Sequence, residues 1–141
     1  MKRIIIAVLC ALGLASALDA QEKEGVVTLS SKDFKTKVYD ISAKNPEYLG
    51  SKPAIVDFYA SWCGPCRAIS PVLEELAKEY GDKIIIYKVD VDASRDIAQA
   101  FGIRSIPAVL FIPMKGEAQM TVGGRSKEDF KKQIDTILLG K

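Results

Sequence analysis

Two cysteines, Cys63 and Cys66, stand in the stretch "FYASWCGPCRAISP", directly after Trp62, the only tryptophan of the chain. A Cys-x-x-Cys pair can bind a metal ion, cross-link a loop or exchange electrons with another disulfide. A structural zinc site usually needs four cysteine or histidine ligands, and this chain has no histidine. A structural disulfide normally bridges distant segments, because a loop this short removes little entropy from the unfolded chain. Redox chemistry is therefore the favoured interpretation, and no metal site is expected.

The residues around the pair agree with a redox role. The apolar and β-branched run Ala54–Ala60 predicts a strand buried on both faces, and a helix is predicted to begin near Cys63. Free N–H groups and the helix dipole would stabilise a thiolate at that helix N-terminus. Cys66 lies on the same helical face and can reach Cys63. Pro65 suits a first helical turn, and Gly64 leaves space for a partner chain.

An acidic residue, Asp57, falls in the middle of the predicted buried strand. An isolated carboxylate is costly there, and its pKa should rise. A local polar contact or an edge position is one explanation. The other is a proton relay beneath the cysteines, because a thiol must lose its proton before it attacks a disulfide and no histidine is available as a base.

Predicted strands and helices alternate along the rest of the chain. Capping-box spacing at Ser30 and Ser126, each three residues before an aspartate, marks two helix starts. The predicted strands are 26–29, 54–60, 83–91, 108–112 and 118–122, and the predicted helices are 32–41, 63–80, 94–101 and 126–139. This β-α-β-α-β-α-β-β-α order predicts an α/β fold, a mixed central sheet flanked by helices. Strands separated by helices should pair in parallel, and the closing hairpin through Lys115-Gly116 should be antiparallel.

The first twenty residues differ from the remainder. Lys2 and Arg3 precede an apolar run from 4 to 18, and small residues end at Ala17 or Ala20. This pattern predicts a secretory signal peptide over residues 1–20 and a mature domain over 26–141. A transmembrane anchor is the alternative, but a helix needs about 20 apolar residues to span a bilayer, and the apolar run from 4 to 18 is shorter. Cleavage would also remove Cys10, leaving a single thiol pair in a compartment where disulfides persist.

The length and net charge of the chain limit the number of domains and the classes of partner that are expected. A chain of 141 residues has room for one compact domain. Its net charge is +2, with acids and bases mixed along the sequence, so nucleic acid is not an expected partner. No Gly-rich dinucleotide motif follows a strand, so no cofactor is expected. Nothing in the sequence suggests oligomers, and a monomer without stable membrane insertion after cleavage is predicted.

The motif Trp62-Cys63-Gly64-Pro65-Cys66, in this setting, resembles the active-site motif of thioredoxins. The resemblance runs from about 26 to 139, through "VDFYASWCGPCRAISPVLEELAKEY", "YKVDVD", "FGIRSIPAVLFI" and "VGGRSKEDF". It implies a thioredoxin fold, with Cys63 as the exposed attacking thiol and Cys66 as the more buried resolving thiol.

The same resemblance implies roles for residues farther along the chain. Ile106-Pro107 resembles the family's cis-proline, which aligns a substrate strand; an ordinary proline at a strand entry is the alternative. A buried acid is implied at Asp57, with Lys88 as its partner lysine. Gly64 and Pro65 belong to the implied substrate-binding surface, and the positions that resemble the groove beside the disulfide are Trp62, Ile106 and Gly123. The sequence departs from the family at Tyr59, where many members have tryptophan, and in the segments 41–53 and 111–116.

The resemblance implies a reductase of protein disulfides, because the Gly-Pro pair resembles the reducing branch of the family. An oxidase or isomerase with the same fold is the nearest alternative, and a binding module or chaperone with incidental thiols is another. With the signal peptide, a reductase would be secreted across the inner membrane to the periplasm. Its substrates would be proteins with disulfides, and its electrons would come from another protein, for which a membrane thiol relay is the natural donor.

Overall fold

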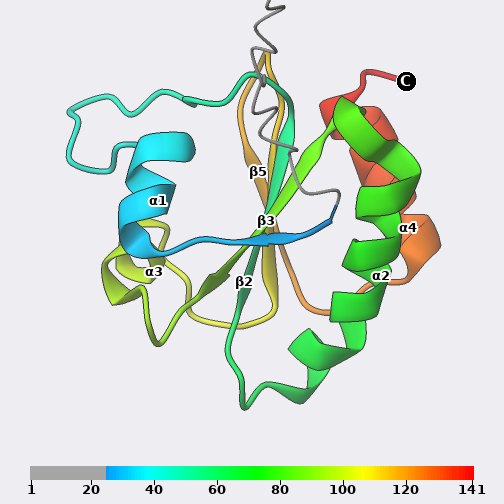
Figure 1. The fold of residues 1–141 in the computed structure, drawn as a ribbon, viewed down its shortest axis with the longest axis horizontal. Coiled ribbons are helices and arrows are strands. Elements are labelled where there is room, and N and C mark those ends of the chain that lie inside the picture. Colours follow the sequence, from blue (N-terminus) through cyan, green and yellow to red (C-terminus); the bar gives the residue numbers. More distant parts are fainter. Residues whose placement is uncertain (1–24) are drawn as a thin grey trace, which may run out of the picture.

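A computed structural model describes residues 25–141. The predicted signal peptide and Cys10 lie outside the described residues. A five-stranded sheet forms the centre of the domain. Helices α1 (Ser31–Lys37) and α3 (Arg95–Ala100) cover one face of the sheet, and α2 (Gly64–Tyr80) and α4 (Lys127–Gln133) cover the other (Figure 1). The predicted element order and the mixed sheet flanked by helices are confirmed.

The strands of the sheet lie in the order β1-β3-β2-β4-β5. Their bounds are Val27–Thr28 for β1, Ala54–Tyr59 for β2, Ile85–Asp90 for β3, Ala108–Ile112 for β4 and Gln119–Val122 for β5. Strand β3 pairs in parallel with both β1 and β2, whereas β4 pairs antiparallel with β2 and β5. Strand β2 therefore occupies the centre.

The prediction that all helix-separated strands pair in parallel is wrong for β4. Helix α3 has six residues and is about 9 Å long, too short to carry the chain back along the sheet. Strand β4 consequently begins at the edge where β2 ends, with Ala108 opposite Phe58. The chain then runs antiparallel to β2.

Two helices end differently from their predicted bounds. Helix α1 ends at Lys37, before the predicted Ile41, because Val38 is fully buried and its carbonyl accepts a hydrogen bond from Leu49 N–H at 2.9 Å. Helix α4 passes at Ile134 into a wider π-helical turn that ends at Leu138. Helix α2 continues through Pro71. None of the helices within 25–141 combines the length and hydropathy needed to cross a membrane.

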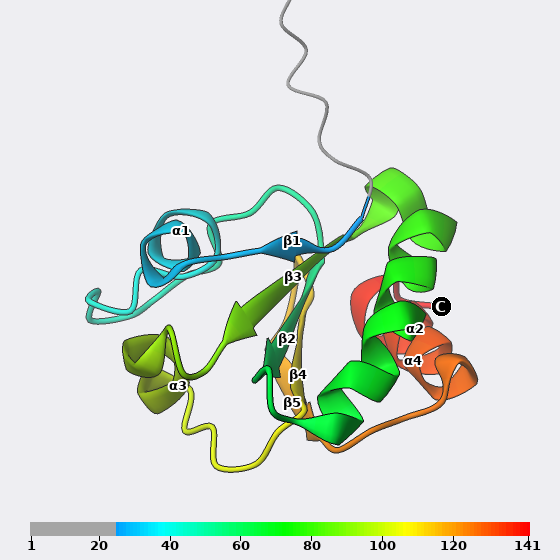
Figure 2. The same ribbon diagram turned by 60° about the horizontal axis from the view of Figure 1, so that its bottom comes forward.

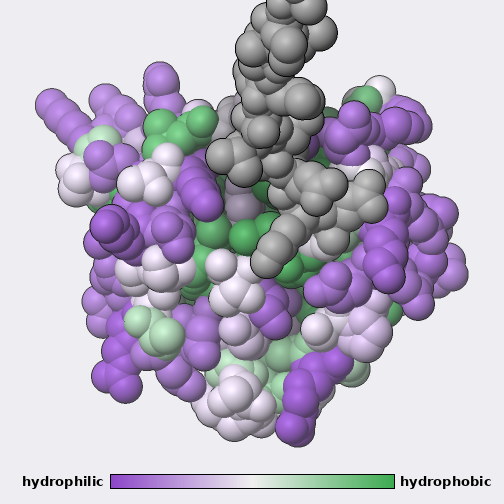
Figure 3. Space-filling model, viewed as in Figure 1, coloured by the Kyte–Doolittle hydropathy of each residue, from purple (hydrophilic) through white to green (hydrophobic). Residues whose placement is uncertain are grey.

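The sheet separates two apolar layers. Val56 and Phe58 pack on the side of α1 and α3 with Phe34 and Ile97, whereas Ile55 packs on the side of α2 and α4. The second layer includes Leu73 and Leu76 of α2, Phe111 of β4 and Phe130 of α4. Hydrophilic residues lie over both flanks of the molecule, where the helices face outward (Figure 3). Strand β2, buried on both faces as its apolar run predicts, is thus fixed from two sides.

The two capping boxes are present with matching geometry. Ser30 Oγ accepts from Asp33 N–H at 3.1 Å and donates to Asp33 Oδ2 at 2.9 Å. Ser126 and Asp129 repeat both distances at the start of α4. Each serine therefore satisfies a backbone N–H that the helix leaves free.

We expect Ser30→Ala and Ser126→Ala each to lower the free energy of unfolding by about 1 kcal/mol, because each removes an N-cap hydrogen bond. Urea denaturation measures the change, with Ser51→Ala in an exposed loop as the control. Equal stability of the two variants that lack a cap and the Ser51→Ala control would contradict the assignment of these caps.

Candidate active site

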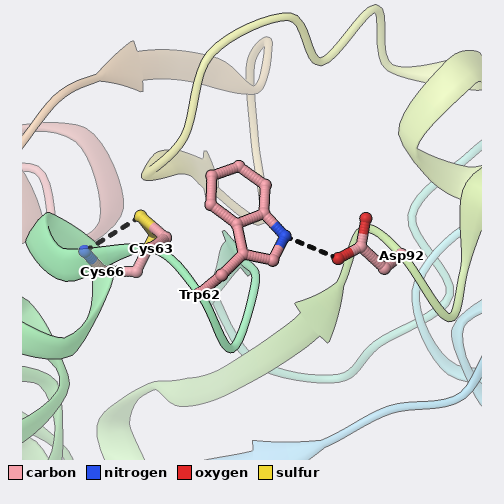
Figure 4. Close-up of a disulfide and its surroundings, with 4 residues drawn as sticks. All are labelled: Trp62, Cys63, Cys66 and Asp92. Carbon is pink, nitrogen blue, oxygen red and sulfur yellow. Dashed lines mark hydrogen bonds between the residues drawn. A yellow bond between two sulfur atoms is a disulfide. The ribbon is translucent and has the colours of Figure 1, made fainter.

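Cys63 and Cys66 form a disulfide at the start of α2, with their Cα atoms 5.3 Å apart. Cys63 is the N-cap residue, and its Sγ accepts a hydrogen bond from Cys66 N–H at 3.2 Å (Figure 4). The same N–H and the helix dipole can stabilise a thiolate on Cys63 after reduction. Pro65 lies in the first turn, where a missing N–H has no cost.

The disulfide lies just below the molecular surface. The implied exposure of Cys63 is not found in the oxidised protein: Cys63 is 4% exposed and Cys66 3%. Both cysteines pack against Ala60 and the partly buried Ile106. Above them Gly64 is exposed, and a Cβ atom built on it would meet nothing within 4 Å. The turn therefore leaves open space through which another chain can approach the sulfur atoms.

Trp62 stands beside the disulfide and is 68% exposed. Its indole N–H donates to Asp92 Oδ2 at 2.8 Å, which fixes the ring between the disulfide and the loop after β3 (Figure 4). An exposed aromatic ring fixed in this way is suited to contact an apolar substrate side chain. The sequence analysis did not single out Asp92; its only signal was its place at the end of the matching stretch "YKVDVD".

Two further loops meet α2 at the same end of the sheet. Figure 2 shows the start of α2 near the segments that follow α3 and β5. The Ile106–Pro107 peptide bond is cis, and Pro107 is buried. Gly123 N–H donates to Pro107 O at 2.8 Å, and Gly123 has φ of 95°, a conformation that favours glycine. This backbone contact brings Gly123, Ile106 and Pro107 together beside the cysteines.

A cavity of about 180 Å³ lies beneath the disulfide, on the side of the sheet that α2 covers. Asp57, Lys88 and Cys66 line it, together with Tyr59 and Arg67. Of the two cysteines, only Cys66 reaches this cavity. The structure thus brings Asp57, Lys88 and Cys66 to one partly open cavity.

Asp57 is the charged group of this cavity that is most removed from water. It is 3% exposed, and its Oδ1 has no hydrogen-bond partner. Burial raises the pKa of Asp57 from 3.8 to about 7, although the positive charge of Lys88 partly opposes the rise. A carboxyl group with this pKa can gain and lose a proton near neutral pH, as a general base must.

The sequence profile of the Thioredoxin family matches residues 25–136. The chain belongs to the thioredoxin family. Thioredoxins are protein-disulfide reductases, so the Cys63–Cys66 pair is that of a thioredoxin-type thiol–disulfide oxidoreductase acting on protein disulfides.

Individual thioredoxins resemble the chain closely. A thioredoxin of Borreliella burgdorferi is 43% identical over 109 residues, which are 77% of this chain and 93% of that protein. The chloroplastic M-type thioredoxin of Pisum sativum is also 43% identical, over 64% of this chain, but the match spans only 53% of the pea protein. The crystal structure of chloroplastic thioredoxin z superposes with a TM-score of 0.68 at 25% identity, covering 80% of this chain and 94% of the other.

We expect Asp57→Asn to stabilise the oxidised thioredoxin domain at alkaline pH. Because burial raises the pKa of Asp57, its charged form opposes folding, so wild-type stability should fall as pH rises from 3.8 to about 7. The asparagine amide carries no charge. The free energy of unfolding of Asp57→Asn should therefore exceed that of the wild type by an amount that grows over this pH range to on the order of 4 kcal/mol. Urea unfolding at pH 4 to 8 measures it, with the exposed Asp82→Asn as control. A constant difference at every pH would show that Asp57 ionises in the folded protein as it does in water.

Proposed function

We propose that this thioredoxin is exported and reduces disulfides of proteins in the periplasm, with Cys63 as the attacking thiol and Cys66 as the resolving thiol. The observation that carries these roles is the asymmetry of the pair. Cys63 is the N-cap of α2, where a thiolate is stabilised, whereas Cys66 alone of the two lines the cavity with Asp57.

In the first step the Cys63 thiolate attacks one sulfur of a substrate disulfide. A bond forms between Cys63 and that sulfur, the substrate S–S bond breaks, and the other substrate sulfur leaves as a thiolate that takes up a proton. The open space over Gly64 supports this approach. Trp62, Pro65, Ile106, Pro107 and Gly123 are proposed to hold the substrate segment beside Cys63.

In the second step Asp57 accepts the proton of the Cys66 thiol, directly or through water in the cavity. The Cys66 thiolate then attacks Cys63, forms the intramolecular disulfide and releases the second substrate sulfur as a thiolate, which is protonated in turn. The pKa of about 7 supports Asp57 as this base. Lys88 is proposed to act on the ionisation of Asp57 through its positive charge.

The protein leaves the reaction oxidised and must receive two electrons before the next turnover. Because no cofactor is proposed, a second dithiol protein is the donor, and in the periplasm a membrane thiol relay fits this requirement. The proposal of export rests on Lys2, Arg3 and the apolar run that follows them. The working form is proposed to be a monomer.

We expect Cys66→Ser to accumulate mixed disulfides with substrate proteins, because Cys63 still attacks but nothing resolves the intermediate. Cys63→Ser should lower the reduction of an insulin disulfide by about 100-fold or more, because the nucleophile is gone. Non-reducing gels and mass spectrometry identify the trapped partners, with the double serine variant as control. Retention of the same partners by the double variant would instead favour a binding module, and reduction by Cys63→Ser would exclude the mechanism.

We expect the full-length chain to be exported when it is produced in a bacterium with two membranes. The mass of the periplasmic protein should correspond to cleavage after Ala17 or Ala20. Leu9→Arg, which puts a charge in the apolar run, should keep the chain uncleaved in the cytoplasm, and Leu9→Ile should be exported normally. Uncleaved wild-type protein in the cytoplasm would contradict the proposed localisation.

A further inference from the structure

Lys88 is directed toward an aromatic ring rather than toward the carboxyl group beside it. Asp57 and Lys88 are opposite each other in the parallel pairing of β2 with β3. Lys88 Nζ nevertheless lies 4.6 Å from the centroid of the Tyr59 ring. Asp57 Oδ1 stays without a hydrogen bond. In this cavity the Lys88 ammonium group and the Asp57 carboxyl group interact electrostatically without a direct hydrogen bond, and the ring of Tyr59 contacts the ammonium group.

We propose that Tyr59 is a positioning residue: its ring holds the Lys88 ammonium group beside Asp57 and so sets how readily that carboxyl group takes up the proton of Cys66. This inference rests on the proposed function, in which Asp57 is the base for Cys66.

The strand geometry explains why Tyr59 can do this. Side chains two residues apart on a strand point to the same face, so Asp57 and Tyr59 both lie on the face of β2 that α2 covers. A lysine has a flexible four-carbon side chain whose ammonium group is strongly attracted to water. The negative face of an aromatic ring attracts that ammonium group and restricts it. Without the ring, the Lys88 charge would extend toward solvent, away from Asp57.

The other charged groups around the cavity are few, so the effect can be isolated. Lys88 comes from β3, Cys66 and Arg67 come from α2, and Asp90 of β3 is opposite Tyr59 in the register. In the oxidised protein Cys63 and Cys66 are joined and cannot titrate. The chain has no histidine, so no imidazole overlaps a titration near neutral pH.

A double-mutant cycle on the oxidised protein tests the proposal. The pKa of Asp57 is measured from the carboxyl ¹³C shift of labelled aspartate, assigned by comparison with Asp57→Asn. The proteins compared are the wild type, Tyr59→Leu, Lys88→Met and the double variant, with Tyr59→Phe as the control that keeps the ring.

Lys88→Met should raise the pKa of Asp57, because it removes the cation that opposes the rise. Tyr59→Leu should raise that pKa by about half a pH unit when Lys88 is present, and should not raise it in the Lys88→Met background. Tyr59→Phe should match the wild type. The pH profile of mixed-disulfide resolution by Cys66 should move by the same amount as the titration.

Several results would overturn the proposal. An equal shift from Tyr59→Leu in both backgrounds would mean that the ring acts through packing alone, and no shift or a fall would mean that it does not hold the ammonium group near Asp57. If Tyr59→Leu does not fold, Tyr59→Met replaces it in the same cycle. The titration needs no substrate, so failure of Cys66→Ser to trap partners would count against the proposed function and not against this placement of Lys88.

Discussion

The burial of β2 on both of its faces is the constraint on which the rest of the structure depends. Its side chains alternate between two apolar layers, so helices must cover the sheet on both sides. The central place of the strand also determines where the site can form. Its last residue is followed within a few positions by Cys63, so the disulfide lies at the edge of the sheet where the core ends. The packed core beneath fixes the loop that carries the disulfide.

The same strand carries an energetically unfavourable buried group, Asp57. Ile55 and Asp57 lie on the same face, but Ile55 packs in an apolar layer whereas Asp57 leaves an oxygen without a partner. Burial of this carboxyl group costs stability whenever it is charged, and the pKa of about 7 expresses that cost. An apolar residue at this position would remove the carboxyl group that shares a cavity with Cys66. The domain therefore gives up stability at the residue that we propose as the proton acceptor for Cys66.

The disulfide is enclosed by segments that are distant in sequence and meet through a few specific contacts. The Trp62 indole is fixed by Asp92 after β3, and the Pro107 carbonyl accepts from Gly123 after β5. The surface that a substrate would touch therefore combines an exposed aromatic ring with backbone, and hydrogen bonds fix both. Exposed Gly64 adds open space to this surface, because a Cβ atom built on it would meet nothing within 4 Å.

The sequence by itself determined the elements, the family and the chemistry of the cysteine pair. Those features depend on local signals: the apolar run of β2, the serine caps at Ser30 and Ser126, and the Trp-Cys-Gly-Pro-Cys motif. Only the tertiary structure decided the antiparallel entry of β4, the early end of α1 at the buried Val38, and the contacts of Trp62 and Lys88. The physical reason is that a helix cap or a strand pattern involves neighbours in sequence. The partner of a side chain such as Lys88 is chosen among groups that meet only when the chain has packed.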